Sequence, residues 1–457
     1  MAKKRVLKIT PVLVTLNILV LLLIAGFYTT RLIKYYLKEN GHKNSEEAVL
    51  LVDAIKKKQS FLDETKGLVL DEETGIYRYK GEVEDNYVLY SGMLYRVISI
   101  DKENRIKLVS ENNVTLMYPG FKNGYKDSYV NKWLNSSDAK YSGIYESALV
   151  NSDVLLENTK FCADTIDDVS NITCEEEIDD YKVSLLSLYD YKLAGGKSSY
   201  LNNGEMFYFG SLDKNNDSYY VTGEGELALN QKESKAITVK PVITLNGDNE
   251  LLGGKGTLKD PYIIEKHDVT ILGETYVNNI ISINDNKYKV VEVLDDKVKL
   301  VSTEVLMDKE DKLSIAFGGS NSAYTTSNTV GKYLNTTFLN SLDVKDSVVN
   351  GDYFISTLNL SNLDYASLRG SKVTAKVAML TMGDMFVNEG KNEFTILRGM
   401  EATNMINVLN ENGNFFADTI SSKYNVRPAF YLKYDLKIKS GSGTLEDPYK
   451  LGDNNEG

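Results

Sequence analysis

The polar stretch between Asp213 and Glu224 has the residue spacing of a calcium-binding loop. Asp213, Asn215, Asp217 and Glu224 stand where positions 1, 3, 5 and 12 of such a loop carry oxygen ligands. Position 6, where the sharp turn prefers glycine, is Ser218, and the pattern has no counterpart later in the chain. We therefore favour a solvated polar loop here, and calcium is the one cofactor that the sequence leaves open.

Histidine, the usual general base near neutral pH, is scarce in this chain. The two histidines are His42 and His267, and neither lies in a motif that repeats. A Ser-His-Asp or Cys-His nucleophile is therefore not expected. The glycine-rich stretch 253–257 leads into a proline and not into a helix, so we interpret it as a turn and not as a phosphate loop.

Two acidic positions recur in matched motifs and could support carboxylate chemistry. One pair, Asp190 and Asp384, follows apolar runs, where capping or termination of a helix is the plainer interpretation. The other pair, Asp260 and Asp447, precedes prolines, where an Asx-type turn is plainer. The sequence thus predicts no catalytic residue.

Cys162 and Cys174 are the only cysteines in the chain, and the segment between them is polar. In an oxidising compartment this spacing predicts a disulfide that closes a short loop. By chain entropy such a bridge adds about 3 kcal/mol of stability. A zinc site is less favoured because no histidine lies nearby.

The elements that position these residues come in two copies. The sequence KPVITLNGDNELLGGKGTLKDPY at 240–262 matches RPAFYLKYDLKIKSGSGTLEDPY at 427–449 without a gap. At a constant offset of 187, the shared motif aligns Pro241 with Pro428, Gly256 with Gly443, Asp260 with Asp447 and Pro261 with Pro448. Such a repeat indicates one fold used twice.

Further segments repeat in the same order at drifting offsets: 93–110 with 287–302, 130–137 with 330–337, and 182–190 with 376–384. The second of these aligns Trp133 with Tyr333, and we interpret both as structural. Surface loops accept insertions and core segments do not, so drifting offsets fit one fold with loops of different length. We predict two homologous ectodomains at 67–265 and 268–457. Hairpin-like apolar runs and many loops indicate an α+β fold that is rich in strands.

The residues before the first copy predict a membrane anchor. Residues 9–30 carry no charge and, as a helix of about 33 Å, can span a bilayer. The basic residues around them favour a cytoplasmic tail at 1–8 and an extracellular location for the rest. A cleaved signal peptide fits less well, because cleavage after Ala25 would place Leu23 at a small-residue position. Residues 31–66 are interpreted as a helical connector, with a helix from Asn44 or Ser45 to Gly67 that packs on the first copy or the membrane surface.

Charge argues against nucleic acid as a partner. After residue 30 the chain carries 48 basic and 64 acidic residues. A surface this acidic repels phosphate backbones. The acidity instead suits solubility beside a membrane or cell wall.

The motifs resemble those of a known family. They are TGIYRYKG, NYVLYSGMLYRVISI, the KWLN segment, and a final VKP or VRP strand with a GTLxDPY tail. Together they are similar to surface domains of unknown function from low-GC Gram-positive bacteria, over about residues 68–451. The resemblance implies an exported ligand-binding or structural module and a fold related to the C-type-lectin-like and sulfatase-modifying-factor group. It implies no catalytic site.

Three functions remain open from the sequence. The first is a membrane-anchored extracellular binding protein whose tandem domains recognise a protein or an envelope glycan. The second is a structural or assembly component of a cell-envelope membrane complex. The third is a glycan hydrolase that uses a pair of carboxylates. We favour the first, which is not an enzyme.

Overall fold

The computed structural model describes residues 48–136, 149, 154, 156–163, 165–266, 268–320, 323–354, 357–359, 364–367, 372–379, 396–399, 404–409 and 415–452. The predicted cytoplasmic tail, the predicted span at 9–30, both histidines and Asp384 lie outside these residues. No helix within them is long and apolar enough to cross a membrane.

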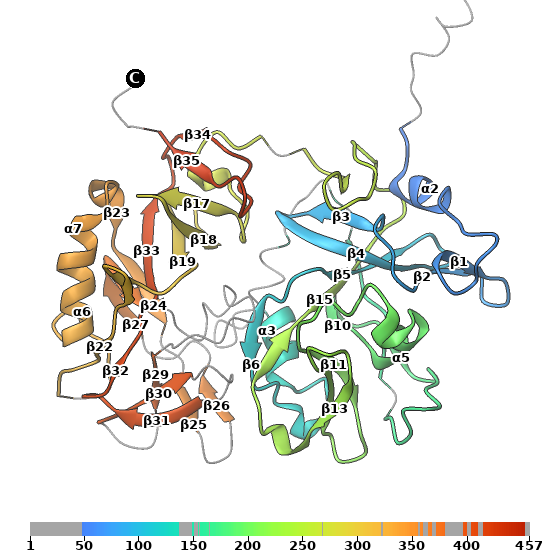
Figure 1. Cartoon of the computed structure of the whole chain (residues 1–457), viewed down its shortest axis with the longest axis horizontal. Helices are drawn as coiled ribbons and strands as arrows, with labels where there is room; N and C mark the ends of the chain where they lie inside the picture. Colours follow the sequence, from blue (N-terminus) through green and yellow to red (C-terminus); the bar gives the residue numbers. More distant parts are fainter. Residues whose placement is uncertain are drawn as a thin grey trace, which may run out of the picture. The chain divides into compact units, whose positions relative to one another are not determined.

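Strands dominate the described chain, which confirms the predicted strand-rich α+β class. Residues Leu50–Gly457 form one compact unit with two hydrophobic cores, one built mainly from residues 51–264 and one from residues 272–449. Each core has its own large sheet (Figure 1). The domain boundary at residues 265–268 stays a prediction.

The first copy is built on a mixed sheet with the order β1-β2-β4-β5-β15-β10. Its strands are β1 (Gly67–Asp71), β2 (Ile76–Lys80), β3 (Tyr87–Tyr90), β4 (Met93–Ile100), β5 (Ile106–Ser110), β7 (Leu156–Glu157), β10 (Val183–Leu185), β15 (Pro241–Leu245) and β16 (Tyr262–Ile263). Smaller sheets contain β6 (Thr115–Met117), β8 (Phe161–Cys162), β9 (Glu177–Ile178), β11 (Phe207–Leu212), β12 (Ser218–Val221), β13 (Leu227–Asn230) and β14 (Ile237–Val239). The α-helices are α2 (Leu51–Lys56), α3 (Tyr129–Asn135) and α5 (Leu188–Leu193), with 3-10 turns at Phe121–Asn123, Gly196–Ser198 and Gln231–Glu233.

The second copy is built on a sheet with the order β23-β33-β19-β18-β17-β35-β34, with β28 also paired to β33. Its strands are β17 (Ile280–Ile283), β18 (Asn286–Val293), β19 (Lys297–Ser302), β23 (Val348–Val349), β28 (Val377–Met379), β33 (Pro428–Lys433), β34 (Ile438–Ser440) and β35 (Tyr449–Leu451). Smaller sheets contain β20 (Met307–Asp308), β21 (Asp311–Lys312), β22 (Ile315–Ala316), β24 (Gly351–Phe354), β25 (Thr357–Asn359), β26 (Asp364–Ser367), β27 (Lys372–Ala375), β29 (Ile396–Gly399), β30 (Met405–Leu409), β31 (Phe415–Thr419) and β32 (Lys423–Tyr424). The helices are α6 (Thr329–Tyr333) and α7 (Leu339–Ser341), joined by a π-turn at Leu334–Phe338, with 3-10 turns at Leu272–Glu274 and Lys345–Ser347.

The two sheets share one register. Pro241 and Pro428 begin the closing strands β15 and β33, which pair with β10 and β28 at matching positions. The same strands pair with β5 and β19 on the other side, again at matching positions. Strand β4 has a bulge between Val97 and Ser99, and β18 has one at the aligned place. The repeat in the sequence is therefore a repeat in hydrogen bonding.

An asparagine side chain ties α3 to the sheet of the first copy, and another ties the π-turn after α6 to the sheet of the second copy. The Asn135 amide donates to the Val183 carbonyl at 2.7 Å and accepts from its N–H at 3.1 Å. Asn335 makes the same two bonds to Val377, at 2.8 and 3.1 Å. Within these helices Trp133 is buried and the aligned Tyr333 is half-buried, so both pack against the fold as expected.

The closing motif forms the same turn twice, but not the one predicted. The N–H of Asp260 is accepted by the Thr257 hydroxyl at 3.2 Å, and that of Asp447 by the Thr444 hydroxyl at 3.1 Å. Threonine side chains therefore cap these turns, and the expected Asx-type turn was wrong. In each turn the threonine hydroxyl accepts the N–H of the aspartate itself, whereas an Asx-type turn would use the aspartate carboxylate as the acceptor.

Glycine is required just before this turn. Gly256 and Gly443 have φ angles of 78° and 75°. A Cβ at either position would lie about 2.5 Å from a tyrosine ring, that of Tyr262 or Tyr449. The carbonyl of Pro261 likewise approaches Gly254 too closely for a side chain. The aligned glycines thus allow the last segment of each copy to pack closely against the rest of that copy.

The connector differs from its prediction. Its helix α2 ends at Lys56 and not at Gly67, which instead begins β1. Leu51, Val52 and Ile55 are buried in the first core, and the Leu51 N–H donates to the Asn249 carbonyl at 2.9 Å. This stretch is part of the first copy, and the basic run after Lys56 is not helical because no apolar stripe continues there.

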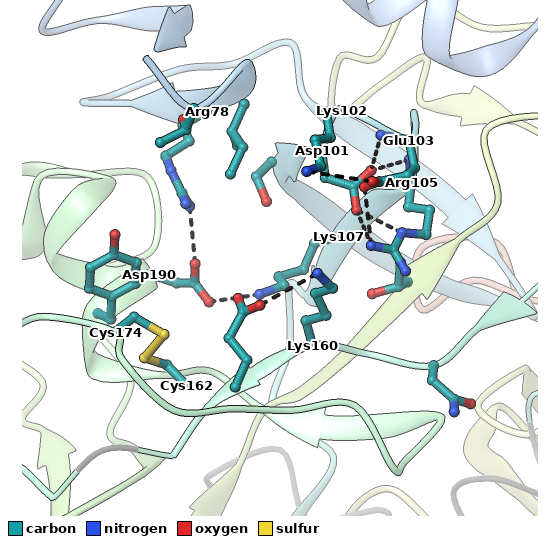
Figure 2. Close-up of a pocket in the computed structure, with 17 residues that line it drawn as sticks. Arg78, Asp101, Lys102, Glu103, Arg105, Lys107, Lys160, Cys162, Cys174 and Asp190 are labelled. Atoms are coloured by element: carbon teal, nitrogen blue, oxygen red, sulfur yellow. Dashed lines mark hydrogen bonds and ion pairs between the residues drawn. A yellow bond between two sulfur atoms is a disulfide. The ribbon is translucent and has the colours of Figure 1, made fainter. Parts of the chain in front are cut away.

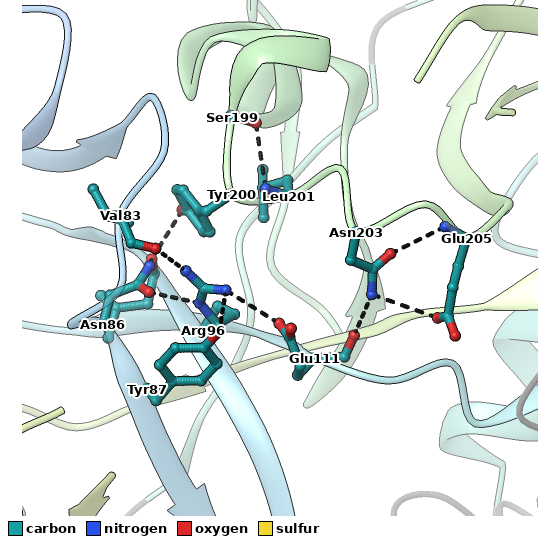
Figure 3. A network of polar contacts seen from close by, with 11 residues as sticks. Val83, Asn86, Tyr87, Arg96, Glu111, Ser199, Tyr200, Leu201, Asn203 and Glu205 are labelled. Atoms are coloured by element: carbon teal, nitrogen blue, oxygen red, sulfur yellow. Dashed lines mark hydrogen bonds and ion pairs between the residues drawn. The ribbon is translucent and has the colours of Figure 1, made fainter. Parts of the chain in front are cut away.

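Buried cations recur at two aligned positions with the residue types exchanged. The first copy has Arg96 and Lys240, and the second has Lys289 and Arg427. Arg96 donates to the Asn86 side chain and the Val83 carbonyl, each at 2.6 Å, and to the Tyr87 hydroxyl at 2.8 Å (Figure 3). It also lies 3.9 Å from the Tyr87 ring centroid, so its charge is well satisfied.

Lys240 has a less polar environment. Its ammonium group lies 4.9 Å from the Phe207 ring centroid. Burial lowers the pKa of Lys240 to about 8, against the opposing effect of Glu111 and Glu205. The folded protein thus disfavours the charged form of this lysine.

We predict that Lys240→Met raises the free energy of unfolding at pH 7 by about 1–3 kcal/mol, because it removes an incompletely compensated buried charge. The penalty in the native protein is fully present below pH 8. It is relieved as the pH rises from there toward the unfolded lysine pKa of about 10.4, where the folded state has already released its proton. The advantage of the variant should therefore shrink between pH 8 and 10. Urea denaturation at several pH values measures it, with the exposed Lys259→Met as control. A constant advantage across that range would contradict the prediction.

Candidate functional site

A polar pocket of about 230 Å³ lies on the sheet of the first copy. Its walls come from strands β2, β4, β5 and β15, the turn after β4, the start of α5 and the disulfide loop. The lining consists of Thr74, Ile76, Arg78, Ser99, Asp101, Lys102, Glu103, Arg105, Lys107, Asn158, Lys160, Cys162, Cys174, Glu177, Tyr189, Asp190 and Thr244. Charged side chains face each other across it (Figure 2).

A single row of side chains forms the floor of the pocket. Arg78 on β2 lies directly opposite Ser99 on β4. Ser99 lies opposite Lys107 on β5, and Lys107 lies opposite Thr244 on β15. Directly opposed residues of antiparallel strands project from the same face, about 4.5–5.5 Å apart. Four neighbouring strands thus deliver a guanidinium, two hydroxyls and an ammonium group to one surface.

Asp190 joins the two cations of this row. Its carboxylate accepts from Arg78 at 3.2 Å and from Lys107 at 3.1 Å (Figure 2). The side chain of Asp190 is 6% exposed, and those of Arg78 and Lys107 are 14% and 17% exposed. Ser187 caps helix α5 and also donates to Asp190 at 2.9 Å. Asp190 thus lies in the first turn of α5 and neither caps nor ends the helix as expected, and its ion pairs were not foreseen.

The electrostatics of Asp190 follow from these partners. Burial alone would raise its pKa, but the Lys107 ammonium and the Arg78 guanidinium outweigh burial and hold the pKa below its ordinary value. Asp190 is therefore ionised at neutral pH. Because one carboxylate serves two cations, the three groups together carry a net positive charge.

The rim of the pocket is held by further ion pairs and by the disulfide. Arg105 binds Asp101 at 2.6 Å across the turn after β4. On the other side, Lys160 lies 3.4 Å from Glu177. Cys162 and Cys174 form a disulfide with an S–S distance of 2.07 Å, as predicted, and line the pocket. The bridge is thus part of a wall of this site (Figure 2).

Thr244 has an unsatisfied hydroxyl. The residue is 5% exposed, and its Oγ1 finds no hydrogen-bond partner within the described residues. A buried hydroxyl without a partner is costly, so such groups in native proteins need an explanation. Thr244 also lines the pocket, so this hydroxyl lies next to the open space of the site.

The aligned place in the second copy is filled. Glu292, Lys299 and Tyr431 occupy the positions of Ser99, Lys107 and Thr244, with the same strand register. The Tyr431 hydroxyl donates to Glu292 at 2.6 Å. The Lys299 ammonium lies 5.8 Å from the Tyr431 ring centroid. A tyrosine and a carboxylate thus take the space that two small hydroxyl residues leave open in the first copy.

The calcium candidates are not gathered in one place. Asp213, Asn215 and Asp217 lie in the turn between β11 and β12, whereas Glu224 lies in the turn at the other end of β12. The Asp213 carboxylate accepts the N–H groups of Asn215 and Asp217 at 2.8 and 2.9 Å. In the part of the chain that the structure describes, no group of three or more His, Cys, Asp or Glu residues could hold a metal ion. Calcium binding stays a prediction.

No protein-family model gives a significant match to the chain, and no curated protein or solved structure does so either.

Sequence reasoning missed the floor of the pocket. Lys107 and Lys299 stand at matching places in the repeated segments 93–110 and 287–302, and a charged residue inside an apolar strand of both copies was the available signal. Arg78, Ser99 and Thr244 carried no such signal. They become neighbours only through pairing between strands that are far apart in the chain, which one sequence does not specify.

We predict that Asp190→Asn lowers the free energy of unfolding by about 3 kcal/mol at neutral pH, because two largely buried cations lose their carboxylate. Asp190 has a depressed pKa, so its stabilising effect is present above the unfolded aspartate pKa of about 3.9 and is lost as the pH falls through the folded value. The difference between the two proteins should therefore shrink below about pH 4. Thermal unfolding from pH 3 to 7 measures it, and exposed Asp248→Asn is the control. Equal stability at pH 7 would refute the role of Asp190.

Proposed function

We propose that this chain is a non-catalytic, extracellular binding protein that holds one unit of an envelope glycan in the pocket of its first copy. Residues 9–30 anchor it in the cell membrane with the N-terminus in the cytoplasm. Its two copies are tandem domains of C-type-lectin-like character. The second copy has a structural role and does not bind the same ligand.

The unsatisfied Thr244 hydroxyl is the observation that carries this proposal. It is buried, lines the pocket and has no partner within the described residues. Sugar hydroxyls both donate and accept hydrogen bonds, so they suit a site of serine and threonine hydroxyls with cationic donors. The pocket, at about 230 Å³, is smaller than sites for drug-sized ligands, which begin at about 300 Å³. A single sugar unit fits this scale.

The state of the pocket carboxylates supports a binding role over hydrolysis. A general acid for glycan cleavage needs a raised pKa, but Lys107 and Arg78 lower that of Asp190. Glu177 lies in an ion pair with Lys160, and Asp101 in one with Arg105. These carboxylates serve to position cations.

Other features support an extracellular location. Disulfides persist in oxidising compartments, and this one lines the pocket wall. The acidic composition of the chain after residue 30 suits a protein that is soluble beside a membrane.

We predict that Thr244→Tyr abolishes glycan binding, because it gives the first copy the residue that fills the same place in the second copy. The measurement is saturable binding of purified envelope polysaccharide to the full-length protein in detergent micelles, by biolayer interferometry. Thr337→Tyr, at an exposed site in the second copy, is the matched control and should bind like the native protein.

Near-UV circular dichroism shows whether each variant keeps its packing. Saturable binding that survives in a folded Thr244→Tyr protein would place the ligand elsewhere and refute the proposed site. Absence of binding by the native protein would favour the assembly role, in which the anchor and connector make the main contacts.

A further inference from the structure

We infer that the pocket selects an acidic sugar unit, whose carboxylate or phosphate group lies beside Arg78 and Lys107 and whose neighbouring hydroxyl meets Thr244. This inference rests on the binding function proposed above and names the chemical class of its ligand.

The first argument is the charge left over on the pocket floor. Arg78 and Lys107 share the carboxylate of Asp190, at 3.2 and 3.1 Å. All three side chains are at least four-fifths buried. Burying a charge is expensive unless it is paired. An anion that enters the pocket would compensate the excess positive charge, which a neutral ligand would not do.

The second argument is the supply of donors. A guanidinium carries five N–H groups. Among the described residues Arg78 donates one hydrogen bond, to Asp190. Lys107 likewise donates one of its three, also to Asp190. The remaining donors belong to a planar fork and a point charge, which are the groups that proteins use for carboxylates and phosphates.

The third argument is the order of groups along the floor. Thr244 lies directly opposite Lys107, and Ser99 lies directly opposite it on the other side. A ligand oxyanion bound at Lys107 would therefore bring an adjacent ligand hydroxyl to within reach of Thr244. An acidic sugar carries an oxyanion and hydroxyls on nearby atoms of one molecule, so it can contact Lys107 and Thr244 at the same time.

The second copy provides an internal comparison. Glu292 occupies the position of Ser99 and lies directly opposite Lys299, the counterpart of Lys107. Its carboxylate accepts a hydrogen bond from the Tyr431 hydroxyl at the Thr244 position. The second copy thus holds, within its own chain, a carboxylate and a hydroxyl where we place those of the ligand in the first copy.

The test measures the affinity of the full-length protein in detergent for glucuronate, glucose 6-phosphate and glucose, by isothermal calorimetry. We expect one of the two acids to bind about 10–100-fold more tightly than glucose, since a hydrogen bond to a charged group contributes about 1.5–3 kcal/mol. The better acid identifies the ligand group as carboxylate or phosphate. Affinity should fall as salt is added.

Ser99→Glu is the decisive variant, because it copies the carboxylate of the second copy into the first. It should reduce acid binding at least about 10-fold and leave the weak binding of glucose less affected. Lys107→Gln and Arg78→Gln should weaken acid binding, and Asp190→Asn, if folded, should strengthen it. Lys160→Gln removes a more exposed lining cation and serves where the floor variants do not fold. Exposed Lys259→Gln is the control.

The outcomes separate this inference from the proposed function. If glucose binds as tightly as both acids, and Ser99→Glu changes nothing, the pocket is not selective for anions. Binding of envelope polysaccharide that Thr244→Tyr abolishes would then still support the proposed function. If none of the three sugars binds while the polysaccharide does, the acidic-sugar inference is wrong as well.

Discussion

The pairing of the closing strand with the centre of the sheet is the constraint on which each copy depends. In the first copy β15 lies between β5 and β10, although about 130 residues separate β5 from β15 in the chain. In the second copy β33 takes the same place beside β19 and β28. Both strands are buried on both faces, so shifting either strand by one residue would exchange the side chains that pack on its two faces. The register is therefore fixed by burial, and it also fixes which side chains stand beside Lys107 and Lys299.

The two copies share the positions of their buried cations but differ in the acidic residues near them. Cations stand at three aligned positions in each copy, and the charge is kept even where arginine and lysine exchange. Among the described residues, the carboxylate beside the aligned lysine comes from a different element in each copy. In the first copy helix α5 supplies Asp190 from beyond the sheet. In the second copy Glu292 comes from the strand next to Lys299. Glu292 takes the place of Ser99 within the row of side chains, whereas Asp190 reaches the row from α5 and leaves the Ser99 position to a small residue.

This contrast explains which features could be predicted from the sequence. The repeat, the disulfide and the strand-rich class depend on local patterns and on matched segments, so one sequence contains them. The turn at Thr257 was misjudged because threonine and aspartate side chains can each accept a backbone N–H in a turn, and the sequence does not show which of them does so. The helix that ends at Lys56 was predicted to continue to Gly67, because charged residues extend the helical pattern although they bury no apolar surface. The pocket floor was missed because opposition across four strands is a tertiary property.

The tyrosine that fills the row of the second copy depends on its neighbours. The Tyr431 ring packs against the Tyr353 ring, with centroids 5.4 Å apart. It also passes so close to Gly351 that a Cβ there would lie 1.9 Å from the ring. A tyrosine at this position therefore needs a residue without a side chain at the start of β24. The first copy has instead kept a small threonine over an open space, at the expense of one unsatisfied hydroxyl. The same strand register therefore supports a filled row in the second copy and an open row in the first, and the proposed ligand site rests on this difference.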